Sequence, residues 1–192
     1  MAAVAAFVGT AALAVALTRA PASDGVSLSS DVSPRVCATS GLEAWLGLGA
    51  AGETDAGSRP AEGTYYTLEF TNVSDRACSL FGYPEVSAYR DTPEARGPIG
   101  SAAARDTSVR PKPVTLAPGA TAHAELRVTT VGVQPASCAQ VTAEELRIAL
   151  PRQTRPAFVP VHIPVCSQKG QVSLSVQAIQ ARPGVPGFTL PP

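Results

Sequence analysis

Short segments in which apolar and polar residues alternate restrict the fold of this chain more than any other feature. Segment 121–129 is the clearest, with an apolar face formed by Ala122, Ala124, Leu126 and Val128. The same period of two runs through 65–70, 145–150 and 172–177, and more weakly through 42–48, 86–89 and 158–163. Successive side chains of a strand point to opposite faces, so this period indicates strands with one buried face.

Proline and glycine separate these segments at roughly strand-length intervals. The chain has 18 prolines and 16 glycines, and sequences typical of turns, such as Ala117-Pro118-Gly119, stand between the alternating runs. Segment 142–145 resembles a helix cap, but Pro135 and Pro151 leave room for only a turn or two of helix. Residues 91–112 are the least strand-like, and we expect a long solvated loop there. The sequence therefore predicts an all-β antiparallel sandwich of about seven to eight strands.

An uncharged apolar run occupies residues 2–17 and is followed by Arg19 and the sequence Ala20-Pro21-Ala22. A membrane span needs about 20 apolar residues, so this run is typical of a secretory signal peptide (1–22) that is cleaved after Ala22. The alternative is an uncleaved N-terminal anchor. Either interpretation predicts a secreted or cell-envelope protein with a linker (23–35), a sandwich domain (36–180) and a tail rich in proline and glycine (181–192).

Four widely spaced cysteines, Cys37, Cys78, Cys138 and Cys166, all follow the targeting segment. An even number of cysteines in an exported chain predicts two disulfides. Four cysteines allow three connectivities, and the sequence alone does not choose among them. Our working hypothesis is Cys37 with Cys78 and Cys138 with Cys166. In the loop-entropy model each bridge would stabilise the fold by about 3–4 kcal/mol.

Charge and motif content constrain the function mainly by exclusion. Fifteen basic and fifteen acidic residues leave no net charge, so we expect no nucleic-acid partner, and a membrane contact only through an uncleaved anchor. The sequence has no nucleophile elbow, phosphate-binding loop or zinc-protease motif, and His123 and His162 stand apart. We therefore expect no catalytic residue, no metal and no cofactor. A hydrolase is the least favoured interpretation.

Aromatic residues are the best candidates for contacts with a partner. Trp45 falls on the face opposite Leu42, Ala44, Leu46 and Leu48, and Tyr83 and Tyr89 lie in and after a turn. Sandwiches commonly present loops and edge strands to partners, so these three residues predict a binding module for a protein or glycan at the cell surface. The alternative is a structural envelope protein without a discrete ligand site.

Several motifs also follow one another in a recognisable order. Phe70-Thr71-Asn72 comes before Cys78-Ser79-Leu80-Phe81-Gly82-Tyr83-Pro84, and Leu116-Ala117-Pro118-Gly119-Ala120 leads into the alternating segment that precedes Cys138 and Cys166. With Cys37 opening a strand, this order resembles the domain-of-unknown-function 4232 family over roughly residues 36–180. The resemblance implies an immunoglobulin-like sandwich in a secreted or envelope-associated actinobacterial protein. It implies no activity, substrate or catalytic residue.

Overall fold

Strands account for nearly all the regular structure in the described part of the chain. The computed structural model describes residues 34–48, 63–129 and 138–184, all within the unit Ser33–Pro192. These residues form thirteen strands and one 3-10 turn (η1, Thr39–Gly41), with no α-helix among them. The strands are β1 (Arg35–Val36), β2 (Leu42–Leu48), β3 (Thr64–Asn72), β4 (Cys78–Leu80), β5 (Glu85–Thr92), β6 (Ala95–Ile99), β7 (Ala104–Asp106), β8 (Val114–Leu116), β9 (Thr121–Val128), β10 (Gln140–Ala149), β11 (Ala157–Cys166), β12 (Leu174–Gln177) and β13 (Gln180–Ala181). The all-β class is confirmed, and seven of these strands have five or more residues.

The largest sheet has the order β2-β3-β9-β12-β7, with β13 also paired to β9. The alternation in β9 has the predicted effect, because Ala122, Ala124 and Leu126 are 0% exposed and the residues between them are only partly buried. In register with β9, Leu68 of β3 lies opposite Ala124 and faces the core. The outer face of this sheet therefore carries the polar half of each alternating segment.

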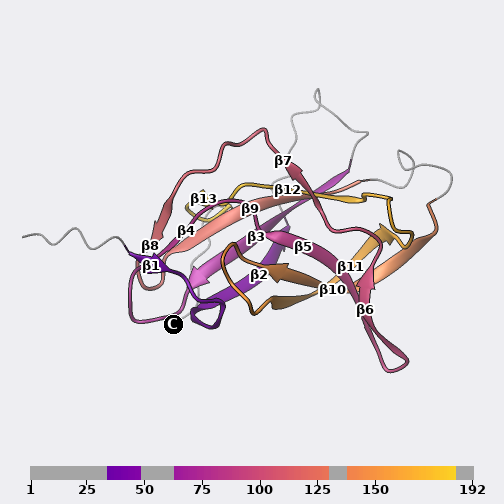
Figure 1. Ribbon diagram of the computed structural model, residues 1–192, viewed down its shortest axis with the longest axis horizontal. Coiled ribbons are helices and arrows are strands. Elements are labelled where there is room, and N and C mark those ends of the chain that lie inside the picture. The colour runs from indigo at the N-terminus through magenta and orange to yellow at the C-terminus, as the bar shows by residue number, and fades with distance from the viewer. Residues whose placement is uncertain (1–33, 49–62, 130–137, 185–192) are drawn as a thin grey trace, which may run out of the picture. The chain divides into compact units, whose positions relative to one another are not determined.

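A second sheet of four strands, in the order β11-β10-β5-β6, supplies the other half of the core. Its buried side chains, including Val86, Leu146 and Ile163, form one hydrophobic cluster with Leu68 and Phe70 of the larger sheet. Burying one such side chain stabilises a fold by about 1.5–3 kcal/mol. Figure 1 shows the strands of both sheets in the body of the domain, and the predicted sandwich is thereby confirmed.

A third, small sheet, with the order β1-β4-β8, lies at one end of the domain, at the left of Figure 1. β1 pairs with β4 in parallel, and β4 pairs with β8 in the antiparallel direction. The Cys37–Cys78 disulfide joins the chain after β1 to the start of β4, with a Cα–Cα distance of 4.8 Å. The second disulfide, Cys138–Cys166, joins the segment before β10 to the end of β11. All four cysteines are thus paired, in the connectivity of the working hypothesis.

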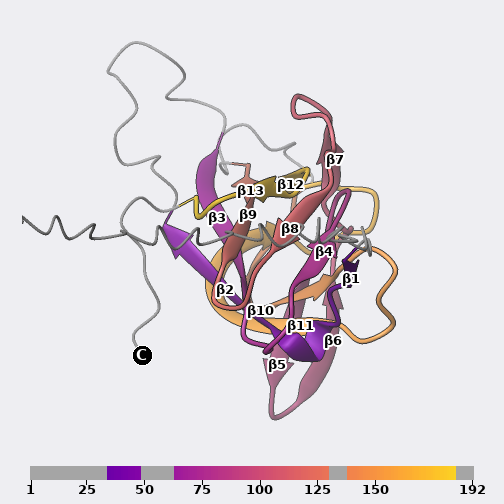
Figure 2. The same cartoon turned by 90° about the vertical axis from the view of Figure 1, so that its left-hand side faces the viewer.

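Two segments differ from the sequence expectation. Residues 91–112, expected to be a loop, contain β6 and β7, and the β5–β6 hairpin extends beyond the rest of the domain in the views of both Figure 1 and Figure 2. Both strands lie at sheet edges with mostly exposed side chains, so they carry no alternating pattern. The helix-cap sequence 142–145 lies inside β10, because pairing with β11, joined by β5 from Glu145 onward, outweighs a local helical preference.

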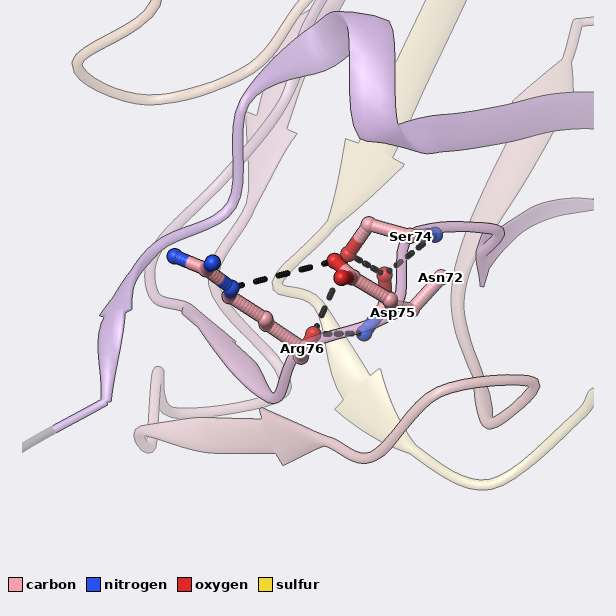
Figure 3. A network of polar contacts seen from close by, with 4 residues as sticks. All are labelled: Asn72, Ser74, Asp75 and Arg76. Atoms are coloured by element: carbon pink, nitrogen blue, oxygen red, sulfur yellow. Dashed lines mark hydrogen bonds and ion pairs between the residues drawn. The ribbon is translucent and has the colours of Figure 1, made fainter.

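One buried amide joins the end of β3, the turn between β3 and β4, and the end of β8. Asn72, the last residue of β3, is 0% exposed. Its side-chain nitrogen donates to the carbonyls of Arg76 (2.8 Å) and Leu116 (3.1 Å). Its side-chain oxygen accepts from the backbone N–H (3.1 Å) and the hydroxyl (2.6 Å) of Ser74. Figure 3 shows this turn, including the exposed Arg76–Asp75 ion pair. Both donors and both acceptor positions of the amide are therefore used.

We expect Asn72→Ala to lower the free energy of unfolding by about 2–4 kcal/mol, because it removes these bonds and takes away the side-chain donor of the buried Leu116 carbonyl. Urea denaturation of the oxidised protein would measure the loss. Asp75→Ala is the matched control, since the Asp75 side chain is 86% exposed and its ion pair should contribute less than about 0.5 kcal/mol. Equal, small effects of the two substitutions would contradict this role of Asn72.

Candidate ligand-binding site

A polar hollow of about 510 Å³ lies on the outer face of the larger sheet, at the strands β7, β9 and β12. Charged, amide, phenol and hydroxyl groups line it: Tyr65, Arg105, Asp106, Thr107, Ser108, Glu125, Arg127, Ser175 and Gln177. Small-ligand sites are concave and contain a few polar groups placed to orient the ligand, and polar groups converge in this hollow. We therefore treat this hollow, the Glu125 hollow, as the candidate site.

Strand register places these groups beside one another. Glu125 and Arg127 are successive outward residues of β9. Arg127 lies opposite Tyr65 of β3 on one side and Ser175 of β12 on the other. The short edge strand β7 then runs parallel to β12, which brings Asp106 into register with Gln177. Four strands from distant parts of the sequence thus contribute side chains to one surface.

The Gln177 amide is the centre of the hydrogen bonds in the hollow. Its nitrogen lies 2.9 Å from a carboxylate oxygen of Glu125, 3.4 Å from one of Asp106 and 3.3 Å from the hydroxyl of Ser108. Its oxygen accepts from the side-chain nitrogen of Gln180 at 3.3 Å. Two N–H groups therefore face three acceptors. A ligand group that donates to Glu125 or Asp106 would supply the hydrogen bond that the two N–H groups of Gln177 cannot provide.

The two carboxyl groups of the hollow respond oppositely to their surroundings. Burial raises the pKa of Glu125, and the negative charge of Asp106 raises it further, against smaller opposing effects of His123 and Arg127. The pKa of Asp106 is lowered, chiefly because the backbone N–H and the hydroxyl of Ser108 donate to its carboxylate. Perturbed carboxyl groups of this kind gather at functional sites more often than elsewhere.

The aromatic residues proposed from the sequence lie in three separate places. Tyr83 is nearest to the hollow, because the Arg105 guanidinium lies over its ring at 5.6 Å and its hydroxyl donates to the Val109 carbonyl. Trp45 lies on β2, opposite Glu69 of β3, and is partly buried. Tyr89 belongs to the other sheet. The structure therefore does not unite these three residues into one contact surface.

Tyr89 lies in an aromatic cluster with Phe158, on β5 and β11. Its ring meets that of Phe158 edge to face, with centroids 5.6 Å apart. The Arg96 guanidinium lies over Phe158 at 5.1 Å and pairs with Glu145 at 3.3 Å. These groups satisfy one another, and the cluster has no convergent unpaired donors or acceptors comparable to those around Gln177.

Sequence reasoning missed Asp106, Glu125 and Gln177. The only signal was their outward position on alternating or short segments, which is also the signature of an ordinary solvated face. Within residues 34–48, 63–129 and 138–184, no group of three or more His, Cys, Asp or Glu side chains is placed to hold a metal ion. Within the same ranges, no helix is long and apolar enough to span a membrane.

These features define the class of the protein: an all-β sandwich with two disulfides and a polar hollow on one outer sheet face. The chain belongs to the family described as "Domain of unknown function (DUF4232)", whose model matches residues 37–182. This match confirms the resemblance carried by the motif order, while an actinobacterial origin stays a prediction. No curated protein and no solved structure matches the chain significantly.

The opposite pKa shifts predict opposite pH dependences of stability. A raised carboxyl pKa means that Glu125 favours the folded state at low pH, and this contribution is lost as pH rises through its folded-state pKa. The lowered pKa of Asp106 favours folding above the ordinary aspartate pKa, and this contribution is lost as pH falls.

Glu125→Gln should therefore gain stability relative to the parent protein as pH rises, and Asp106→Asn should lose it. Melting temperatures of the three proteins between about pH 3 and pH 8 would test this pair. Each variant acts as the control for the other, because a bond lost at every pH only displaces a curve without tilting it. Curves parallel to that of the parent would contradict the assignment.

Proposed function

We propose that this protein is a non-enzymatic binding module that works outside the cytoplasm, with the Glu125 hollow as its ligand site. The location is supported by the two disulfides, which persist in oxidising compartments. The expected targeting segment, 1–22, lies outside the described residues. The observation that carries the binding function is the convergence of Gln177, Glu125 and Asp106 in one hollow.

The lining of the hollow favours a neutral ligand that has both donors and acceptors. Arg105 and Arg127 balance Asp106 and Glu125 in charge, so neither an anion nor a cation gains a large electrostatic advantage. Carboxylates accept hydrogen bonds and guanidinium groups donate them. A hydroxyl group does both, so a polyhydroxylated ligand would use both kinds of lining residue. The Tyr65 ring adds an apolar surface at the border of the hollow. We therefore propose a glycan as the ligand.

A glycosidic hydrolase is a second candidate, and one specific observation favours it. Asp106 and Glu125 share a hydrogen-bonding amide, and their pKa values shift in opposite directions. Carboxyl pairs in acid–base catalysis have this property, with the raised member as proton donor. In such a pair Asp106, the member with the lowered pKa, would be the base or nucleophile. Binding ranks first because it requires only the converging polar groups, whereas hydrolysis also requires a carboxyl separation that suits a glycosidase. A structural envelope protein without a ligand site is the third possibility, and the hollow is the observation against it.

A glycan array with the full chain at neutral pH would test the proposal. We expect binding to at least one neutral oligosaccharide, and a Kd about tenfold weaker or more for Glu125→Gln, since a bond to a charged group contributes about 1.5–3 kcal/mol. Glu43→Gln is the matched control, because Glu43 is exposed on β2 of the same sheet and does not line the hollow.

Three results would each point elsewhere. Absence of any bound oligosaccharide would overturn the glycan proposal and favour the structural role. Equal loss of affinity in Glu125→Gln and Glu43→Gln would place the ligand outside the hollow. New reducing ends produced by the parent protein, and not by Glu125→Gln, would replace binding with hydrolysis.

A further inference from the structure

Directly after β13, the chain lies across the outer face of the larger sheet. We call residues 182–184 the C-terminal strap. The Nδ1–H of His123 donates to the carbonyl of Arg182 at 2.8 Å, which requires the proton on Nδ1 because a carbonyl only accepts. Two residues later, the backbone N–H of Gly184 donates to a carboxylate oxygen of Glu69, also at 2.8 Å. His123 and Glu69 are cross-strand partners on β9 and β3. The strap is thus held at both ends by one pair of neighbouring side chains.

The face under the strap is buried, although the sequence pattern makes it the polar face. Glu69 is 0% exposed and Thr67 is 5% exposed, and every residue of β3 from Thr67 to Asn72 is buried. Removing a carboxylate from water is costly unless donors replace the lost hydration. The Gly184 N–H is one of those donors. The Glu69 carboxylate therefore serves as the hydrogen-bond acceptor for the strap.

Only glycine fits at the end of the strap. A Cβ atom on Gly184 would overlap the methyl group of Thr67 and lie 2.9 Å from two carbon atoms of the His123 ring. At the start of the strap, Arg182 has a φ of 75°, a backbone conformation that is unfavourable for a residue with a side chain. The two hydrogen bonds therefore hold a specific backbone shape, and the close approach of Thr67 and His123 excludes a side chain at position 184.

We propose that Thr67, Glu69 and His123 form a binding site for an Arg-Pro-Gly type of segment, which this chain fills with its own C-terminal strap. The same site accepts such a segment from another chain when the strap leaves. Recognition uses one backbone acceptor, one backbone donor and the absence of a side chain, so it reads the shape of the segment and the glycine.

Gly184→Ala in the full chain should empty the site. The added methyl group overlaps Thr67 and His123, so the strap must lift. We expect hydrogen exchange of the amide at position 184 to become at least about tenfold faster, since its bond to a charged acceptor is lost, and the NMR signals of the His123 ring to shift. Gly97→Ala is the matched control, because a Cβ there would meet no atom within 4 Å and its φ is not positive.

The emptied site should then bind the segment in trans. Acetyl-Arg-Pro-Gly-amide at about 10 mM, above the millimolar effective concentration supplied by a short tether, should restore the His123 signals of Gly184→Ala. It should leave the parent protein and Gly97→Ala unchanged, and acetyl-Arg-Pro-Ala-amide should have no effect on any of them.

Four results would overturn the proposal. The first is unchanged exchange and His123 signals in Gly184→Ala, because the strap would then not need glycine. The second is a lifted strap without peptide binding, which would make the strap a fixed part of the fold. The third is equal binding of the glycine and alanine peptides. If Gly184→Ala fails to fold, Glu69→Gln gives a second route, and unchanged exchange of the Gly184 amide in that variant is the fourth.

Discussion

The end of the sandwich that carries the small sheet depends on a single buried amide. Through its side chain Asn72 ties the β3–β4 turn to the last residue of β8. Through its backbone it receives the turn that begins β9, since its N–H donates to the Ala120 carbonyl and its carbonyl accepts from Gly119. A buried polar group is stabilising only when all its bonds are made, so these segments must be in place together. The Cys37–Cys78 bridge then fixes β1 to the same end.

Sequence reasoning reached the parts of the fold that are determined locally. Period two placed Ala122, Ala124 and Leu126 in the core, because side-chain direction in a strand depends only on the parity of the position. It failed for β7, where three residues form a strand only because β12 lies beside them. In β10 it correctly placed most of segment 145–150 and missed the residues before it. There the local sequence favours a helix cap, and pairing with β11 imposes a strand.

The candidate site could not be predicted either, because a local sequence does not show which strands will lie beside one another. Tyr65, Glu125 and Gln177 are ordinary outward residues within their own segments, and they become a site only through register across four strands. Glu69 is more misleading, because its outward position predicts exposure, whereas it is fully buried and accepts a hydrogen bond from the strap. Both surfaces use the outward row of β9, where His123, Glu125 and Arg127 follow one another. The hydrogen bond from Gln180 to Gln177 connects them.

The Cys37–Cys78 bridge has a mechanical consequence for a chain pulled from its N-terminal side. β1 contributes only two residues to its pairing with β4. Without the bridge, this short pairing alone would hold β1 against the load. With the bridge closed, tension that enters before Cys37 passes through the sulfur atoms to Cys78. The loop between them, with a sequence separation of 41, then carries no tension. This loop contains β2 and β3, so these two strands of the larger sheet stay outside the covalent path of the tension until the bridge is reduced.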